Sequence, residues 1–237
     1  MKKKLLIICA THGDERIGLE AVAELECKNL SDCFDSIVAN IEALNKNVRF
    51  ADCDLNRSYP GDKNSALYEK RRAAEILEIA KGYKYVIDMH EASSGTEDFI
   101  IIAKNRMCQA FPVEFVNMDT VLLWPDPKGP LGEILENEIE LEFGVKGRDR
   151  EEVIAKATEV LEDFIGKIYA KEIEQKPSTK KTYQVYDKLT TDDFKKDINA
   201  LKDFVETEAG GEKFYPLLAG QYIENGIVCY KMRLFNK

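Results

Sequence analysis

Short apolar runs alternate along the chain with longer segments of helical periodicity. This pattern predicts β-strands crossed over by helices, an α/β fold built on a mixed, largely parallel sheet with flanking helices. We expect strands at residues 4–10, 36–42, 83–89, 99–103, 121–124 and 139–143, and helices at 16–26, 68–80 and 148–173.

The pattern changes after Ile173. Residues 174–181 are polar and contain a proline, which is typical of a linker. Strand-like runs follow at 182–189, 214–218 and 227–235. We therefore expect a larger domain over 1–173 and a small, mostly β C-terminal domain over 182–237. A unit of about 60 residues buries too little surface to be stable alone, so it should pack against the larger domain.

The N-terminus has some features of a secretory signal, because three lysines precede the apolar residues 5–10. The apolar run is short and lacks a cleavage site, so a buried first strand is the preferred interpretation. No apolar run reaches the 18 or so residues of a membrane span. The six cysteines contain no C-x-x-C pair, which favours a reducing, cytoplasmic setting.

Charge narrows the class of partner. The chain has 34 basic and 43 acidic residues, a formal net charge of −9. Such a surface repels nucleic-acid phosphates and anionic lipids, so we expect neither nucleic acid nor membrane as a partner. Glycine-rich phosphate loops and a nucleophile elbow are absent, which argues against nucleotide and serine-hydrolase chemistry.

The chain contains only two histidines. His12 follows the first predicted strand and opens an H-x-x-E pattern with Glu15, and His90 ends the strand at 83–89. Both therefore lie at the carboxyl edge of the sheet, where ligands bind in open α/β folds. Two imidazoles and one carboxylate make the three-ligand set of a catalytic zinc site. Two unrelated histidines at strand ends remain the alternative.

Three motifs occur in a characteristic order: H-G-D-E at 12–15, D-L-N-R at 54–57 with P-G at 60–61, and D-M-H at 88–90. In these motifs the sequence resembles the aspartoacylase and succinylglutamate desuccinylase family, a branch of the zinc carboxypeptidase-like fold. The resemblance is strongest from residue 4 to 147. It implies that His12, Glu15 and His90 bind one Zn²⁺ per chain, and that the reaction is hydrolysis of the amide bond of an N-acyl amino acid.

The resemblance also implies roles for other residues. Arg49 would polarise the scissile carbonyl, as a guanidinium beside a developing oxyanion can, unless it is a surface arginine. Asn56 and Arg57 would hold the substrate carboxylate. Asp54 would accept the second ring proton of His12. Tyr222, in the C-terminal region, would reach over the site, although packing between the two domains is as good an interpretation.

A hydrolase of this kind needs a general base that is not a metal ligand. The strand at 139–143 resembles the family strand that ends in a glutamate and a glycine, which favours Glu142 as the base that deprotonates water and passes the proton to the leaving amine. Glu140 lies on the same face of the strand and competes for that role, and a solvated glutamate on an edge strand is the remaining alternative. The family often continues with a proline-rich turn, whereas this chain has Val145-Lys146-Gly147.

The sequence therefore predicts a cytoplasmic, zinc-dependent deacylase for a small N-acyl amino acid. A zinc carboxypeptidase acting on peptides and a metal-binding protein without turnover are the alternatives. The sequence names neither the acyl group nor the amino acid. The family resemblance allows a homodimer.

Overall fold

The computed structural model describes residues 3–103, 111–125, 128–170, 179–194 and 197–235. The strands described are β1 (Leu5–Cys9), β2 (Phe34–Val38), β3 (Tyr85–Ala92), β4 (Phe99–Ala103), β5 (Thr120–Trp124), β6 (Glu138–Gly144), β7 (Lys181–Thr190), β8 (Thr207–Ala209), β9 (Glu212–Leu217) and β10 (Ile227–Leu234). The α-helices described are α1 (Ile17–Cys27), α2 (Ile41–Lys46), α3 (Tyr68–Ala80) and α4 (Arg150–Ala170).

The strands form one mixed sheet in the order β2-β1-β3-β6-β4-β5-β7-β10-β9-β8. Strands β2, β1, β3 and β6 are parallel to one another. Strand β4 is antiparallel to β6 and parallel to β5, and β5 is parallel to β7. The predicted class, a mixed and largely parallel sheet flanked by helices, is confirmed.

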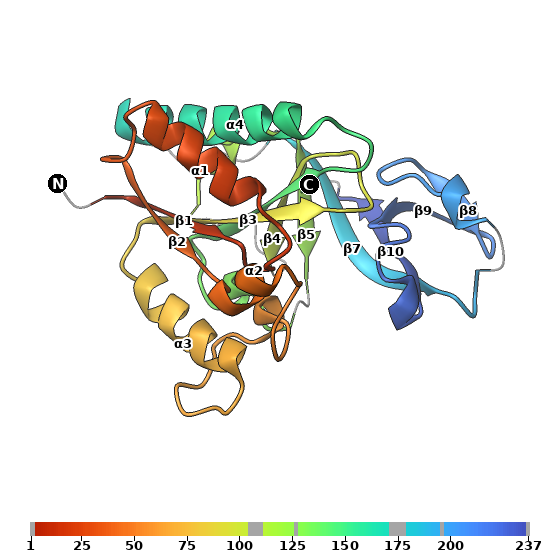
Figure 1. The fold of residues 1–237 in the computed structure, drawn as a ribbon. Coiled ribbons are helices and arrows are strands. Elements are labelled where there is room, and N and C mark those ends of the chain that lie inside the picture. The colour runs from red at the N-terminus through yellow and green to blue at the C-terminus, as the bar shows by residue number, and fades with distance from the viewer. Residues whose placement is uncertain (1–2, 104–110, 126–127, 171–178, 195–196, 236–237) are drawn as a thin grey trace.

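Helices cover both faces of the first half of the sheet, with α1 and α4 on one face and α2 and α3 on the other (Figure 1). Residues of β1 alternate between these two layers. Leu5 and Ile7 belong to the core under α1 and α4, and Leu6 and Ile8 to the core under α3. A strand that is buried on both faces reads as a continuous apolar run, which explains the start of this sequence.

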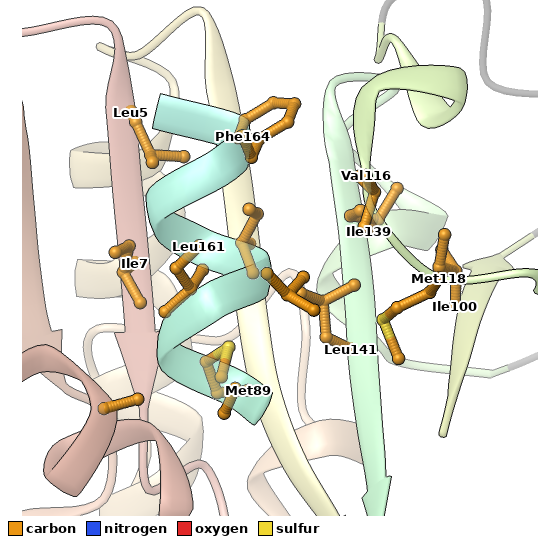
Figure 2. Packing of buried hydrophobic residues seen from close by; sticks show 14 of the residues in the cluster. Leu5, Ile7, Met89, Ile100, Val116, Met118, Ile139, Leu141, Leu161 and Phe164 are labelled. Carbon is orange, nitrogen blue, oxygen red and sulfur yellow. The ribbon is translucent and has the colours of Figure 1, made fainter. Parts of the chain in front are cut away.

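The larger core lies between the sheet and helix α4. Phe164 and Leu161 of α4 lie over Leu5 and Ile7 of β1 and Met89 of β3 (Figure 2). Phe164 also stacks on Phe111 with ring centroids 5.2 Å apart. This packing holds β1 and β3 side by side, and these two strands carry the candidate metal ligands.

Most predicted elements match the observed ones closely, and the segment at 36–42 is the clearest error. Strand β2 ends at Val38. Asn40 then caps helix α2, because its side chain accepts a hydrogen bond from the Ala43 amide at 3.1 Å. Asparagine is a strong N-cap residue, and this local bond ends the extended conformation that the apolar pattern predicted. The last residues of the helix predicted at 148–173 lie outside the described chain.

The C-terminal strands continue the same sheet. Strand β7 pairs with β5 in parallel and with β10 in antiparallel orientation. One apolar cluster contains Ile101 and Leu122 from the first part of the chain together with Tyr183 and Leu217 from the C-terminal part. The predicted boundary between domains stays a prediction, since most of the expected linker lies outside the described residues. Among the helices described, none is long and apolar enough to cross a membrane.

Candidate metal and substrate site

The two histidines meet because β1 and β3 are parallel neighbours in the sheet. His12 follows β1 and His90 lies near the end of β3, and their ring centroids are 5.1 Å apart. Both side chains are almost fully buried, with 3% and 2% of their surface exposed. The sheet edge predicted from the sequence thus brings both imidazoles to one place.

Glu15 lies between the two rings. Its Oε1 is 2.7 Å from His12 Nδ1, and its Oε2 is 3.0 Å from His90 Nδ1. One donor atom from each of these three residues lies within 4.8 Å of the others. The Nδ1 atoms of both rings therefore face the same carboxylate, which is the arrangement in which one cation would be bound by all three residues.

A second carboxylate lies behind each imidazole. Asp54 Oδ1 is 3.2 Å from His12 Nε2, and Asp88 Oδ2 is 3.4 Å from His90 Nε2. The second distance is that of an ion pair rather than of a well-aligned hydrogen bond. Thr11 Oγ1 donates to Asp88 Oδ1 at 2.8 Å. A carboxylate at Nε2 keeps the proton there and leaves the Nδ1 lone pair available to a metal, so this donor set fits Zn²⁺.

The charges of neighbouring side chains shift the pKa values of these ligands. Burial disfavours the charge of Glu15, but the two histidines lower its pKa well below the usual value. Burial likewise opposes protonation of His90, yet Asp88 and Glu15 raise its pKa well above the usual value. The site thus concentrates negative charge around the imidazoles, which is the field that a cation requires.

The loop after α2 is held by Glu69, a fully buried residue of α3. Its carboxylate accepts hydrogen bonds from the amides of Ala51 at 2.6 Å, Asp52 at 3.0 Å and Cys53 at 3.2 Å. This loop carries Arg49, Asp54, Asn56 and Arg57, so Glu69 fixes the backbone from which these side chains extend. The same loop meets the H-G-D-E segment where the Gly13 amide donates to the Arg49 carbonyl. A Cβ on Gly13 would lie 2.1 Å from the backbone of Ala43, so only glycine fits there.

Arg49 lies beside the candidate metal ligands. Its Nη1 donates to Glu15 Oε1 at 3.1 Å, and its side chain is 30% exposed. Burial opposes its charge, but Glu15, Tyr222 and Asp54 together raise its pKa. Arg49 is therefore a fixed cation at the mouth of the site rather than a free surface arginine.

A cavity of about 290 Å³ opens over these residues. It is lined by His12, Arg49, Asn56, Arg57, Glu140, Glu142 and Tyr222, and by Ile101, Ala103, Trp124, Lys128, Pro130, Leu218 and Tyr230. All the sequence-predicted site residues except Glu15, His90 and Asp54 line it, and those three lie directly behind His12 or Arg49. The size suits a small molecule.

Strand register gives the two candidate bases different neighbours. His90 of β3 pairs with Glu142 of β6, and Asp88 pairs with Glu140. Glu142 is thus level with the metal ligand. Burial, opposed by His90, raises its pKa to about 7. Glu140 lies deeper, with 7% of its surface exposed, and accepts a hydrogen bond from Asn56 Nδ2 at 3.2 Å. The two glutamates share a face but have different partners.

Aromatic side chains form the far wall of the cavity. Trp124 and Tyr230 pack edge to face with centroids 4.6 Å apart, and Tyr222 lies 6.2 Å from Tyr230. Tyr222 both lines the cavity and packs against the C-terminal strands, so the two interpretations of this residue are compatible. Burial raises its pKa, which keeps the phenol protonated near neutral pH.

Sequence reasoning missed several residues that shape the site. Glu69 and Glu91 are buried carboxylates that bind backbone amides, and Trp124 and Tyr230 form the aromatic wall. A glutamate in the first turn of α3 was the only signal for Glu69. Nothing in the sequence pairs Trp124 with Tyr230, because they lie on strands far apart along the chain.

Comparison with known proteins supplies independent information. A profile described as the succinylglutamate desuccinylase/aspartoacylase catalytic domain matches residues 1–168. A probable aspartoacylase of Prochlorococcus marinus is 28% identical over 120 residues, which cover 44% of this chain and 40% of that protein. An N-acyl-aromatic-L-amino acid amidohydrolase of Xenopus laevis is 30% identical over 118 residues, covering 43% and 38%. The matches thus span about two fifths of the length of these curated relatives.

Solved structures share the fold along almost the whole chain. The succinylglutamate desuccinylase of Chromobacterium violaceum superposes with a TM-score of 0.76 at 17% identity, covering 99% of this chain and 85% of that one. Murine aminoacylase 3 superposes with a TM-score of 0.71 at 17% identity, covering 98% and 95%. The likeness in fold extends through the C-terminal strands, beyond the matched catalytic region.

Proposed function

Because the chain belongs to the succinylglutamate desuccinylase and aspartoacylase family, we propose that it is a zinc-dependent hydrolase of N-acyl amino acids. The observation that carries the proposal is the convergence of His12, Glu15 and His90 beneath a cavity that also contains Arg49, Arg57 and Glu142. The family members named above are deacylases by description. The acyl group and the amino acid are the open part of the proposal.

His12, Glu15 and His90 would hold the metal through the two Nδ1 atoms and the carboxylate. Bound there, Zn²⁺ would supply Lewis-acid polarisation and make water more acidic in the site. Asp54 would keep the His12 ring in the tautomer that leaves Nδ1 free, and the charge of Asp88, 3.4 Å from His90 Nε2, favours the same tautomer of His90. The fit rests on this donor set, two neutral imidazoles and one carboxylate, which suits zinc better than a hard cation.

Glu142 is the proposed proton carrier. It lies beside His90 across the β3–β6 pair and lines the cavity. A carboxylate whose pKa is about 7 accepts a proton from attacking water and returns it to the departing amine with little cost in either direction. Every histidine of the chain is already in the ligand set, so none is left for this role.

The two arginines of the cavity would act on two groups of the substrate, the scissile carbonyl and the free carboxylate. Arg49, which donates to Glu15, would stabilise the charge that develops on the scissile carbonyl oxygen. Arg57 lines the same cavity near Tyr230 and donates through Nη1 to the Asn56 carbonyl at 2.8 Å, and its remaining N–H groups would grip the carboxylate of the amino acid. Asn56 lies between Arg57 and Glu140 and donates to the latter, so we propose for Asn56 a share in shaping the carboxylate site. Tyr222 would cover the substrate and help to exclude water.

The decisive experiment combines metal analysis with a panel of acetyl-, succinyl- and formyl-amino acids. The expected result is one zinc per chain, hydrolysis of at least one member, and loss of both zinc and turnover in His90→Ala. A His90→Ala variant with full zinc and full activity would exclude the proposal. Hydrolysis of blocked dipeptides but of no N-acyl amino acid would identify a carboxypeptidase instead, and stoichiometric zinc without any hydrolysis would identify a binding protein.

A further inference from the structure

Glu91 is the residue after His90, and on β3 its side chain points to the opposite face of the sheet from the imidazole. It lies under α1 and α4, with only 9% of its surface exposed. No residue of the proposed reaction lies on that face. A buried glutamate there needs hydrogen-bond partners to compensate for its lost hydration.

The partners of Glu91 are the first amides of helix α1. Its Oε1 accepts hydrogen bonds from the backbone N–H groups of Arg16 at 2.5 Å and Ile17 at 2.7 Å. Arg16, the N-cap residue of this helix, makes no capping bond with its own side chain. Glu91 therefore caps α1 from a different element, and its charge faces the positive end of the helix dipole.

This cap acts directly on a candidate metal ligand, because Glu15 immediately precedes the two capped amides. The backbone amide of Glu91 donates to Glu15 Oε2 at 3.1 Å. Glu91 thus holds Glu15 in two ways. The Glu91 carboxylate binds the backbone that follows Glu15, and the Glu91 backbone amide binds the Glu15 carboxylate. Since His90 is the neighbour of Glu91 on β3, the same residue links the backbone segments that carry two of the three ligands.

Arg150, at the start of α4, completes the arrangement. Its Nη2 lies 3.5 Å from Glu91 Oε1 and 2.8 Å from Glu20 Oε2. Glu20 is partly exposed on α1, and its carboxylate pairs with Arg150 rather than with the amides that Glu91 caps. Glu20 is therefore a matched control, a glutamate that shares the same arginine but does not hold the metal-ligand loop.

We propose that Glu91 is a positioning residue for the metal centre, which clamps the Glu15 loop to the strand that carries His90. This inference rests on the proposed function, because it requires that the three ligands bind zinc. The clamp makes the ligand set preorganised before the metal arrives. Without it, zinc binding must itself order the loop, and the affinity falls.

The test measures zinc affinity of the full chain by competition with a chelator, for wild type, Glu91→Ala, Glu91→Gln and Glu20→Gln. We expect Glu91→Ala to weaken zinc binding by about 10–100-fold, the usual effect of removing a residue that orients a ligand. Glu91→Gln keeps a carbonyl acceptor for the amides and should lose less than Glu91→Ala. Glu20→Gln should bind zinc as wild type does.

Simple destabilisation is distinguished by Phe214→Leu, a substitution of a buried residue in the separate apolar cluster of the C-terminal strands, which should lower the melting temperature without altering the strands that carry the ligands. If Phe214→Leu and the Glu91 variants weaken zinc binding alike, Glu91 is only structural and the inference is wrong. If Glu91→Ala does not fold, the test uses Glu91→Gln and Glu91→Asp instead. Wild-type zinc affinity in both folded variants would contradict the proposed positioning role of Glu91. A wild-type chain that binds no zinc contradicts the proposed function, whereas tight zinc in every Glu91 variant contradicts only this inference.

Discussion

Asp54 Oδ1 lies 3.2 Å from His12 Nε2, on the far side of the imidazole from Glu15. The His12 ring is thereby held between two carboxylates, one at each nitrogen. The two carboxylates have different proposed roles. Glu15 would be a metal ligand, whereas Asp54 would only orient the ring. Burial alone would raise the pKa of Asp54, but His12, Arg49 and Arg57 outweigh that effect and lower the pKa to about 2.

Replacement of Asp54 by alanine should weaken zinc binding by about 10–100-fold, because the ring loses the acceptor that keeps its Nδ1 lone pair available. Chelator competition measures the change directly. Asp62→Asn, on an exposed turn of the same region, is the control and should leave zinc affinity unchanged. Unchanged affinity in a folded Asp54→Ala protein would show that Glu15 and packing alone orient His12.

Glu142→Gln should lower kcat by roughly 10²–10⁴-fold, the usual contribution of a general base, while zinc content stays at the wild-type level. Glu140→Gln is the matched variant on the same face of β6. Because Glu140 accepts a hydrogen bond from Asn56, we expect a change in KM rather than in kcat. The opposite pattern, with kcat lost in Glu140→Gln and kept in Glu142→Gln, would reverse the assignment of the base.

The pH dependence follows from the state of Glu142. A base must be deprotonated, and burial raises the pKa of this carboxyl to about 7 in the metal-free protein. Activity should therefore rise with pH through an acidic limb, and bound Zn²⁺, being positive, should move that limb to lower pH. Profiles of kcat/KM for wild type and Glu142→Gln provide the measurement. The same limb in both proteins would assign it to another group.

Arg57→Lys should raise KM by about 10-fold, since a lysine keeps the charge but loses the bidentate grip on a carboxylate. The kcat of this variant should change little. Arg49→Lys should instead lower kcat, because this guanidinium faces the reacting carbonyl. Steady-state kinetics of both variants, with the remote Arg71→Lys as control, separate binding from catalysis. Equal effects of the two substitutions on kcat would contradict the division of roles.

Glu138 is a buried carboxyl of β6, and neither of its side-chain oxygens has a hydrogen-bond partner among the described residues. Burial, together with Glu140 and Asp88, raises its pKa well above the usual value, so the folded protein holds the neutral acid. The unfolded chain ionises near the ordinary pKa. The contribution of Glu138 to the free energy of unfolding is therefore fully present below the pKa of the unfolded chain. It is lost as pH rises toward the higher pKa of the folded protein.

Glu138→Gln should accordingly stabilise the protein at pH 7 and have no effect near pH 4. Each kcal/mol gained raises the melting temperature by about 2–4 °C for a chain of this size. Melting curves at the two pH values, with the exposed Glu208→Gln as control, make the comparison. A Glu138→Gln protein that melts lower at pH 7 than wild type would mean that the carboxylate is ionised and compensated in the folded state.

Sequence alone determined most of the elements and their order, although helix α2 lies where the pattern predicted the end of a strand. Strongly apolar segments such as 4–10 and 99–103 identify buried strands, because burial on both faces admits few other side chains. Spacing also placed His12, Glu15 and His90 at one edge, since the carboxyl ends of parallel strands meet there. The motifs pointed to Arg49, Asp54, Asn56 and Arg57 as neighbours of the site, and the structure brings them together.

Only the tertiary structure decided what depends on contacts between distant segments. Glu140 and Glu142 are equivalent in the alternation of β6, and the register with His90 on β3 separates them. The contact of Asp88 with His90, the amides held by Glu69 and Glu91, and the aromatic pair Trp124–Tyr230 are also set by packing. A linear pattern reports which face a residue occupies, but the residue opposite it is chosen by strand order and register, which the pattern does not encode.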